Sequence, residues 1–302
     1  MQRTETSLPV QGKIRALESE RRAPAASRGL KLARKYPLIA FFLSLLLLLL
    51  LVAIFADVLA PYSQFKTHPA QALQSPGAKH WLGTDQLGRD TLSRVIFGIR
   101  VSLIVAVIAV GIGTVGGITM GLIAGYSGGV IDQILSRFID AQLAFPTLLL
   151  AISIVSALGA SLTNAMIAVG ITAIPSYMRL TRGQVLQARE YEYVTAARII
   201  GASRSRIVVR HILPNILNPL IIVGSLGAGG AILTEAALSF IGIGAQPPTP
   251  DLGSMINNAK DYLQNQAWLA VGPGIAIFLI VWSFANLGDA LRDALDPRLK
   301  ER

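Results

Sequence analysis

The chain has 302 residues, of which 52% are hydrophobic and 15% are charged, whereas a typical soluble domain carries about 25% charged residues. This composition excludes an ordinary soluble domain, and the long uncharged runs between short basic clusters are typical of a chain that crosses a bilayer several times. The formal net charge of +10 does not indicate nucleic-acid binding, because the basic residues lie at the ends of apolar runs, where the positive-inside bias places them. The absence of cysteine excludes disulfide bonds, thiolate metal sites and cysteine nucleophiles.

The N-terminal part begins with a basic segment, residues 1–36, which we predict to be a cytoplasmic tail. Residues 37–60 are predicted to form the first transmembrane helix, because the run from Leu38 to Ala56 carries no charge. At 1.5 Å per residue this run is about 28 Å long, which matches the hydrocarbon core of a bilayer. A cleaved signal peptide is the competing interpretation, but the long leading segment and the apolar runs downstream favour an uncleaved anchor. The mixed, turn-rich residues 61–98 are then expected on the periplasmic or extracellular side.

Further apolar runs follow, and with the first they predict six transmembrane helices in an all-α, polytopic integral membrane protein. Five of the spans belong to a core domain at 99–291, which a basic tail at 292–302 follows. Basic residues cluster in both tails and in the loop at 187–214, so both termini and this loop are expected in the cytoplasm. The core spans are expected at about 100–126, 145–158, 162–180, 215–243 and 269–287.

The second predicted span has a run of small residues on one face. Gly113, Gly117, Gly121 and Gly125 recur with a spacing of four, which aligns them on one side of a helix. Such a face lets another helix approach closely, so we interpret these glycines as a packing surface.

The sequence lacks the usual signs of chemistry. It contains no phosphate-binding loop of the form G-x-x-x-x-G-K-[ST] and no G-x-S-x-G nucleophile elbow. The histidines His68, His80 and His211 are too scattered to suggest a metal site. We therefore predict that the chain is not an enzyme and holds no catalytic, cofactor or metal site of its own.

Glu235 is the clearest ionisable residue inside a predicted span. A carboxylate at membrane depth is costly, so its side chain should face the bundle interior, a partner or a water-filled path. Two roles stay open for it: a group in the translocation path, or a structural hydrogen bond near the outer interface.

The most informative segment is the predicted cytoplasmic loop from Glu192 to Pro214. Its pattern predicts a short helix, a break at Gly201, where glycine permits a turn that bulkier residues resist, and a basic amphipathic helix that returns to the membrane. Pro214 is expected to start the next span, since proline is tolerated in the first turn of a helix. Ala196 and Ala197 are small enough to let another surface approach, so the short helix is a good docking element.

The same segment resembles the coupling loop of ABC-importer permeases, in which Glu-Ala-Ala is followed after three residues by Gly and after nine more by Ile-x-Leu-Pro. The matching residues are Thr195, Ala196, Ala197, Gly201, Leu213 and Pro214. Thr195 stands where that motif has glutamate and His211 where it has isoleucine. The departures affect any ion pair that the glutamate makes, but they leave the predicted docking element unchanged.

Other stretches resemble the dipeptide, oligopeptide and nickel group of these permeases, and in particular its C-type subunit. They occur in the expected order and cover nearly everything after residue 36. They are GTDQLGRD at 83–90, LAFPTLLLA at 143–151, RLTRGQVL at 179–186, TEAALSFIGIG at 234–244 and DPRLK at 296–300.

The resemblance implies a type I ABC-importer permease fold and a function as the membrane-spanning subunit, for peptides or related small solutes. It implies a second homologous permease, two cytoplasmic ATPases that bind ATP and Mg, a solute-binding protein outside the cell, and a bacterial or archaeal inner-membrane location. The coupling residues that it implies are Thr195, Ala196, Ala197, Arg198, Gly201, Ala202, Ser203, Leu213 and Pro214.

The outer signature that it implies consists of Gly83, Asp85, Gly88, Arg89 and Asp90. These residues would face the binding protein, although a structural turn held by Asp85, Arg89 and Asp90 is the interpretation that we favour over direct solute contact. An ATPase-independent secondary transporter or channel is the alternative function. It is disfavoured because the sequence shows no clear internal repeat and only one strong intramembrane carboxylate.

Overall fold

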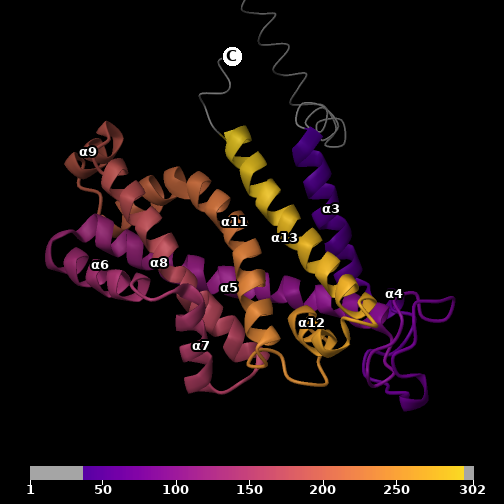
Figure 1. Ribbon diagram of the computed structural model, residues 1–302. Coiled ribbons are helices and arrows are strands. Elements are labelled where there is room, and N and C mark those ends of the chain that lie inside the picture. The colour runs from indigo at the N-terminus through magenta and orange to yellow at the C-terminus, as the bar shows by residue number, and fades with distance from the viewer. Residues whose placement is uncertain (1–36, 296–302) are drawn as a thin grey trace, which may run out of the picture. The chain divides into compact units, whose positions relative to one another are not determined.

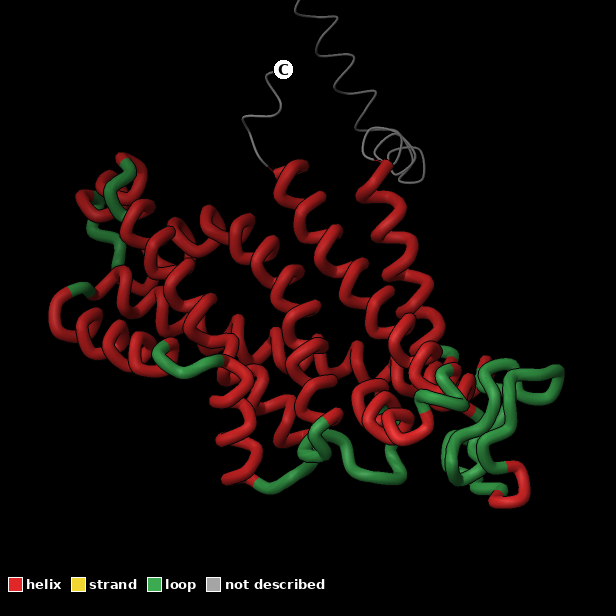
Figure 2. Tube along the Cα trace, in the orientation of Figure 1, coloured by secondary structure: helices red, strands yellow, loops and turns green. Residues whose placement is uncertain are grey.

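The computed structural model describes residues 37–295, and the predicted tail at 1–36 and the DPRLK stretch lie outside the described residues. Among the described residues, 42–295 belong to one compact unit and 37–41 to a separate N-terminal unit. The regular elements in the described part of the chain are helical (Figure 2). A single isolated β-bridge joins Thr84 and Asp90.

The helices follow the predicted spans and loops in order (Figure 1). They are α3 (Pro37–Ile54), α4 (Ala56–Leu59), η1 (Pro69–Gln71), α5 (Thr91–Ser127), α6 (Gly129–Leu143), α7 (Thr147–Leu158), α8 (Leu162–Ala188), α9 (Glu192–Ile199), α10 (Arg204–Arg206), the π-helical turn η2 (Ile207–Ile212), α11 (Leu213–Phe240), α12 (Leu252–Ala259), η3 (Lys260–Tyr262) and α13 (Trp268–Leu295).

Four of the described helical runs are long and apolar enough to cross a membrane: α3, α5, the run at 204–240, and α13. A fifth is obtained if α6 and α7, which meet at a bend of 95°, are taken as one span. The predicted span at 162–180 lies in α8, which is long enough but too polar to be counted with them. The expected number of six is therefore not reached on length and composition alone.

The helix α5 begins at Thr91, inside the segment that the sequence assigned to the outer side and before the predicted start near Arg100. Its start is fixed by Asp90, whose side chain accepts a hydrogen bond of 2.8 Å from the backbone N–H of Ser93. Aspartate is a preferred N-cap because it satisfies a backbone donor that the first helical turn leaves free. The N-cap Asp90 and the polar residues Thr91 and Ser93 indicate the start of this helix in the sequence, but a hydropathy pattern does not detect them.

The glycine face of α5 packs against α8, as the sequence predicted. A Cβ atom on Gly117 would lie 2.8 Å from the backbone oxygen of Ile174 and 2.9 Å from the backbone nitrogen of Met178. A Cβ on Gly121 would lie 2.8 Å from the backbone oxygen of Met178, and one on Gly125 would lie 2.8 Å from a side-chain carbon of Val185. Real side chains do not fit at such distances, so the two helices touch at backbone level.

A proline inside α8 is compensated by a neighbouring helix. Pro175 has no N–H and therefore cannot bond to the carbonyl of Ile171, one turn earlier. The side-chain amide of Gln142, at the end of α6, donates to that carbonyl at 3.1 Å. A bidentate pair between Arg182 on α8 and Asp132 on α6 joins the same two helices at their other ends. Backbone and charged groups in this part of the bundle are thus satisfied within the protein.

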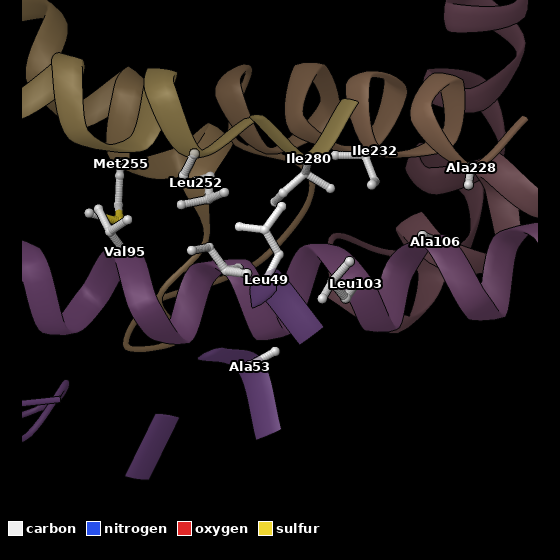
Figure 3. Packing of buried hydrophobic residues seen from close by; sticks show 12 residues of the cluster. Leu49, Ala53, Val95, Leu103, Ala106, Ala228, Ile232, Leu252, Met255 and Ile280 are labelled. Atoms are coloured by element: carbon white, nitrogen blue, oxygen red, sulfur yellow. The ribbon is translucent and has the colours of Figure 1, made fainter. Parts of the chain in front are cut away.

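The main apolar core gathers residues from five helices (Figure 3). It contains Leu49 and Ala53 of α3, Val95 and Leu103 of α5, and buried residues of α11, α12 and α13, including Ile232, Leu252 and Ile280. Phe42 of α3 and Trp282 of α13 make an edge-to-face contact with ring centres 4.9 Å apart. The helices α12 and α4 lie at one end of the bundle, whereas α9 and the C-terminal end of α13 lie at the other end (Figure 1).

Substitution of Gly117 by alanine should destabilise the protein by about 1–3 kcal/mol, because the added methyl group meets backbone atoms of α8 that cannot move independently. Gly111 is the matched control, since it lies on the same helix and a Cβ there has no atom within 4 Å. Gly111→Ala should be neutral or stabilising by up to about 1 kcal/mol, because alanine favours helix. Thermal unfolding in detergent compares the two variants, and equal melting temperatures would contradict the close packing of α5 on α8.

Candidate functional site

The predicted helix break at Gly201 is a well-formed C-terminal cap. Gly201 has a φ of +82°, in the left-handed region that glycine adopts without strain. Its N–H donates to the carbonyl of Arg198 at 3.1 Å, and the N–H of Ala202 donates to the carbonyl of Ala197, also at 3.1 Å. These two bonds are the Schellman motif, which satisfies carbonyls that the end of α9 leaves free.

The short helix α9 has one face inside the chain and one outside. Val194 and Ala197 are buried in a cluster with residues of α8, η2 and α11. Ala196 is exposed, so only one of the two small residues that the sequence offered for docking is available. Ile199 and Ile200 at the C-terminal end are 80% and 84% exposed. Two adjacent isoleucines without cover, held by a fixed turn, are suited to contact with another protein.

The return toward the membrane differs from the expected one. The helix α11 begins at Leu213 with Pro214 in its first turn, as expected, but the helical run is already continuous from Arg204 through α10 and η2. Ahead of Pro214 the chain forms a π-helical turn, in which the N–H of Leu213 bonds to the carbonyl of Val208, five residues earlier. Ser203 caps this run at its beginning by accepting from the N–H of Arg206. Turns of the π type occur often at functional sites, and neither the wide turn nor its bounds were expected from the sequence.

A polar groove of about 580 Å³ lies beside α9. Its charged side chains are those of Arg189, Arg198, Arg204 and Glu190. Arg189 is bonded to Glu190 at 3.0 Å, so the excess of positive charge comes from Arg198 and Arg204. The remaining lining residues are Tyr126, Ser127, Thr195, Ala202 and Ile207.

The outer signature at 83–90 forms a tight buried turn. The carboxylate of Asp85 accepts hydrogen bonds from the backbone N–H groups of Leu87 and Arg89, both at 2.9 Å. It also forms an ion pair with the side chain of Arg89 at 2.6 Å. Gly88 has a φ of +71° and leaves no room for a Cβ against the backbone of His68. Gly83, with a φ of +68°, is similarly enclosed. The five signature residues are thus brought together as parts of one turn.

Two further polar residues attach this turn to the bundle. Arg94 of α5 is buried and donates to the backbone carbonyls of Gln64 and Pro248, so it joins the outer segment to the loop before α12. Its side chain also lies 3.7 Å from the carboxylate of Asp85. His80 lies 2.8 Å from the carboxylate of Asp90. Arg94 belongs to the stretch that follows the outer signature in the sequence, and an arginine so close to an apolar span is a signal that it is satisfied by protein groups.

Glu235 lies in the wall between α11 and α12. Its side chain is 1% exposed and accepts a 2.7 Å hydrogen bond from the hydroxyl of Ser239. The carboxyl of Asp251, the N-cap of α12, lies close enough to act on it electrostatically. No pattern in the sequence pairs Asp251 with Glu235. Of the two roles that the sequence left open for Glu235, these contacts favour the structural one.

Comparison with known proteins identifies the family to which a chain with this arrangement belongs. The family model described as the binding-protein-dependent transport system inner membrane component matches residues 117–301, and a model for the N-terminal transmembrane domain of oligopeptide transport permease C matches residues 33–76. The chain belongs to the binding-protein-dependent transport permeases. It is 47% identical over 251 residues to the dipeptide transport system permease protein DppC of Alkalihalophilus pseudofirmus, with 83% of each chain covered.

Two more comparisons agree with this family. The chain is 43% identical over 255 residues to the glutathione transport system permease protein GsiD of Pectobacterium atrosepticum, with 84% of this chain and 85% of that one covered. In fold, it is similar to a chain of the MetNI methionine ABC transporter in an inward-facing conformation, with a TM-score of 0.53 and 18% identity. That match covers 67% of this permease and 96% of the other chain.

This permease is therefore a membrane-spanning subunit of an ABC importer in the inner membrane. Subunits of this family work with ATPases, which hydrolyse the ATP, and with a substrate-binding protein. The chain itself is not an enzyme. The part that the structure describes contains no cluster of three or more metal-ligating side chains.

Substitution of Asp85 by asparagine should destabilise the permease by about 3–5 kcal/mol, because it leaves two buried guanidinium groups, those of Arg89 and Arg94, without their carboxylate. Asp57→Asn is the matched control, since Asp57 pairs with Arg100 but its side chain is 71% exposed. Its loss should cost about 1 kcal/mol or less. The melting temperatures of the two purified variants test this prediction. An Asp85→Asn variant that is as stable as Asp57→Asn would show that the outer turn does not depend on the ion pair of Asp85.

Proposed function

We propose that this permease forms half of the translocation pathway for di- or oligopeptides and that α9 with the following turn couples the pathway to a cytoplasmic ATPase. The single observation that carries the coupling assignment is the pair Ile199 and Ile200, which are 80% and 84% exposed at a capped helix end. The second homologous permease, the two ATPases and the external binding protein are part of the same proposal.

The proposed coupling site consists of Thr195, Ala196, Ala197, Arg198, Gly201, Ala202, Ser203, Leu213 and Pro214. Ile199 and Ile200 would supply apolar contact with an ATPase, and the adjacent groove with Arg198 and Arg204 would accept acidic groups of the same partner. Ala197 and Leu213 act from inside, because they pack in the cluster that holds α9 on α8 and α11. The coupling site would make different contacts with the two states of the ATPase. Because of that difference, ATP binding would shift the permease between its inward- and outward-open states.

The topology that we propose has six spans, at 37–60 and within the core domain at 99–291, with α8 as the fourth. A span enclosed by other helices does not need a lipid-facing surface, and α8 packs against α5, α7 and α11, which supports its inclusion despite its polar residues. Both tails, 1–36 and 292–302, and the loop at 187–214 would lie in the cytoplasm. The position of α9 at the same end of the bundle as the C-terminal end of α13 supports this orientation (Figure 1).

The outer segment at 61–98 and α12 would then lie on the side of the binding protein. In this proposal Gly83, Asp85, Gly88, Arg89 and Asp90 shape the surface without contacting solute, since Asp85, Arg89 and Asp90 are buried and bonded to one another or to the backbone. The proposed substrate class is peptides, because relatives that cover most of this chain are named for dipeptide, di/tripeptide and glutathione transport.

A cysteine introduced at Ser203 should form an ATP-dependent crosslink to a co-expressed ATPase in membranes. The native chain has no cysteine, so the label is confined to that position. Cysteine at Val209 is the matched control, because Val209 is 61% exposed on the same segment but lies beyond the proposed docking end. Equal crosslinking at both positions, or none at Ser203, would contradict the assignment of α9 and its turn as the coupling site.

Cells or proteoliposomes that contain the assembled transporter should take up a labelled dipeptide, and unlabelled di- and tripeptides should compete whereas free amino acids should not. Gly201→Pro is the matched negative control for coupling, because proline cannot adopt a φ of +82° and has no N–H for the capping bond. Uptake that peptides fail to inhibit would contradict the substrate class, and normal uptake by Gly201→Pro would contradict the coupling role.

A further inference from the structure

Two carboxyl groups meet in the buried contact between α11 and α12. Glu235 is 1% exposed and Asp251 is 0% exposed. The hydroxyl of Ser239 donates to Oε1 of Glu235 at 2.7 Å and accepts from the N–H of Ala245 at 3.0 Å. The carboxyl of Asp251 lies close enough to Glu235 to act on it electrostatically. Two residues after Asp251, a Cβ on Gly253 would clash with the backbone of Ala236, so α12 packs directly against α11 beside the carboxyl pair.

The hydrogen bonds of the pair account for only one oxygen of each carboxyl. Oε1 of Glu235 is satisfied by Ser239, and Oδ1 of Asp251 caps α12 by accepting from the N–H of Ser254 at 2.8 Å. Oε2 of Glu235 and Oδ2 of Asp251 are buried and have no donor. Two ionised carboxylates in contact in a low-dielectric interior repel each other strongly, and each unsatisfied oxygen adds a desolvation cost.

We propose that Glu235 and Asp251 bind one proton between Oε2 and Oδ2, and that this shared proton is the polar link that holds α12 on α11. One proton removes the repulsion and supplies the missing donor to both free oxygens. It also requires no cavity, unlike a metal ion, and the described residues contain no third ligand that would complete a metal site here.

The charged groups around the pair are few. Neither α11 nor α12 carries another charged residue. From α5, Arg94 acts electrostatically on Asp251 and favours a single negative charge on the pair, while Asp85 and Arg89 of the outer turn are bonded to each other. The charges of α13, which begin at Asp289, lie near its C-terminal end, far along the helix from α12. The charged groups around Glu235 and Asp251 therefore compensate one negative charge on the pair, and not two.

Burial raises the pKa of Asp251 above its ordinary value. The folded protein therefore keeps a proton at a pH at which the unfolded chain, with carboxyl pKa values near 4, has lost it. The stability that this proton contributes is complete below the unfolded pKa and is lost as the pH rises through the folded pKa. Over that interval the folding equilibrium constant should fall by up to about tenfold per pH unit, the slope for one proton bound on folding.

The test is infrared spectroscopy of the complete permease in lipid or detergent between pH 5 and 9, together with melting temperatures over the same range. The wild type should show the carbonyl stretch of a buried protonated carboxylic acid at neutral pH, and its melting temperature should fall with rising pH. Glu235→Gln replaces the proton with a permanent amide donor, so it should remove the band and flatten the pH dependence while the protein stays folded. Asp251→Asn should do the same, since asparagine also serves as an N-cap.

Asp261→Asn is the matched control, because Asp261 lies ten residues further along the same outer stretch and is exposed. It should leave the band and the pH profile unchanged. The proposal is overturned if the wild type shows no protonated carboxyl at neutral pH, or if the band survives both Glu235→Gln and Asp251→Asn. A wild-type spectrum without the band overturns the proposal even if either variant fails to fold, and one folded variant is enough to assign a band that is present.

Discussion

The close contact between α5 and α8 is the constraint on which the other parts of this permease depend. Gly117 and Gly121 bring the two backbones together without intervening side chains, so the position of α8 is set by α5 and not by adjustable rotamers. In a bilayer the hydrophobic effect does not drive helices together, so packing of this kind and internal hydrogen bonds must do so. The fixed course of α8 in turn determines where α9 emerges, and α9 carries the two exposed isoleucines.

The two ends of the bundle are stabilised by different interactions. At the outer end, buried ionic and capping bonds around Asp85, Asp90 and Arg94 close an irregular segment that has little regular structure of its own. At the other end, an apolar cluster under α9 supports a surface that stays open to solvent. In the orientation that we propose, the first end faces the binding protein and the second faces the ATPases.

Much of the fold could be predicted from the sequence, because the spacing of apolar and small residues and the positions of glycine indicate where helices pack and end. The glycine spacing in α5 and the break at Gly201 were both predictable from residue types with one dominant conformational role. The start of α5 was not found by hydropathy, since its first turn contains Thr91, Ser93 and Arg94 and a hydropathy pattern locates only the apolar middle. The π-helical turn before Pro214 depends on a choice between bonds four and five residues apart, which no local pattern distinguishes.

The candidate site shows the same division. The segment that carries the proposed coupling residues was recognisable from spacing, but the inward face of Ala197 and the outward face of Ile199 follow from tertiary packing. Glu235 stood out as a lone carboxylate in an apolar run, whereas its partner Asp251 is sixteen positions later in a polar loop. Pairings between residues so far apart depend on how α12 folds back, which a single sequence does not specify.

The Schellman turn after α9 also affects the thermodynamics of association. A flexible loop that orders on binding loses conformational entropy, and that loss weakens the complex. Here the two capping bonds and the buried Val194 and Ala197 have already fixed the segment in the isolated chain. A protein that binds Ile199 and Ile200 therefore meets a preorganised surface, and differences in affinity between its own conformations can be passed to the membrane helices with little loss to local ordering.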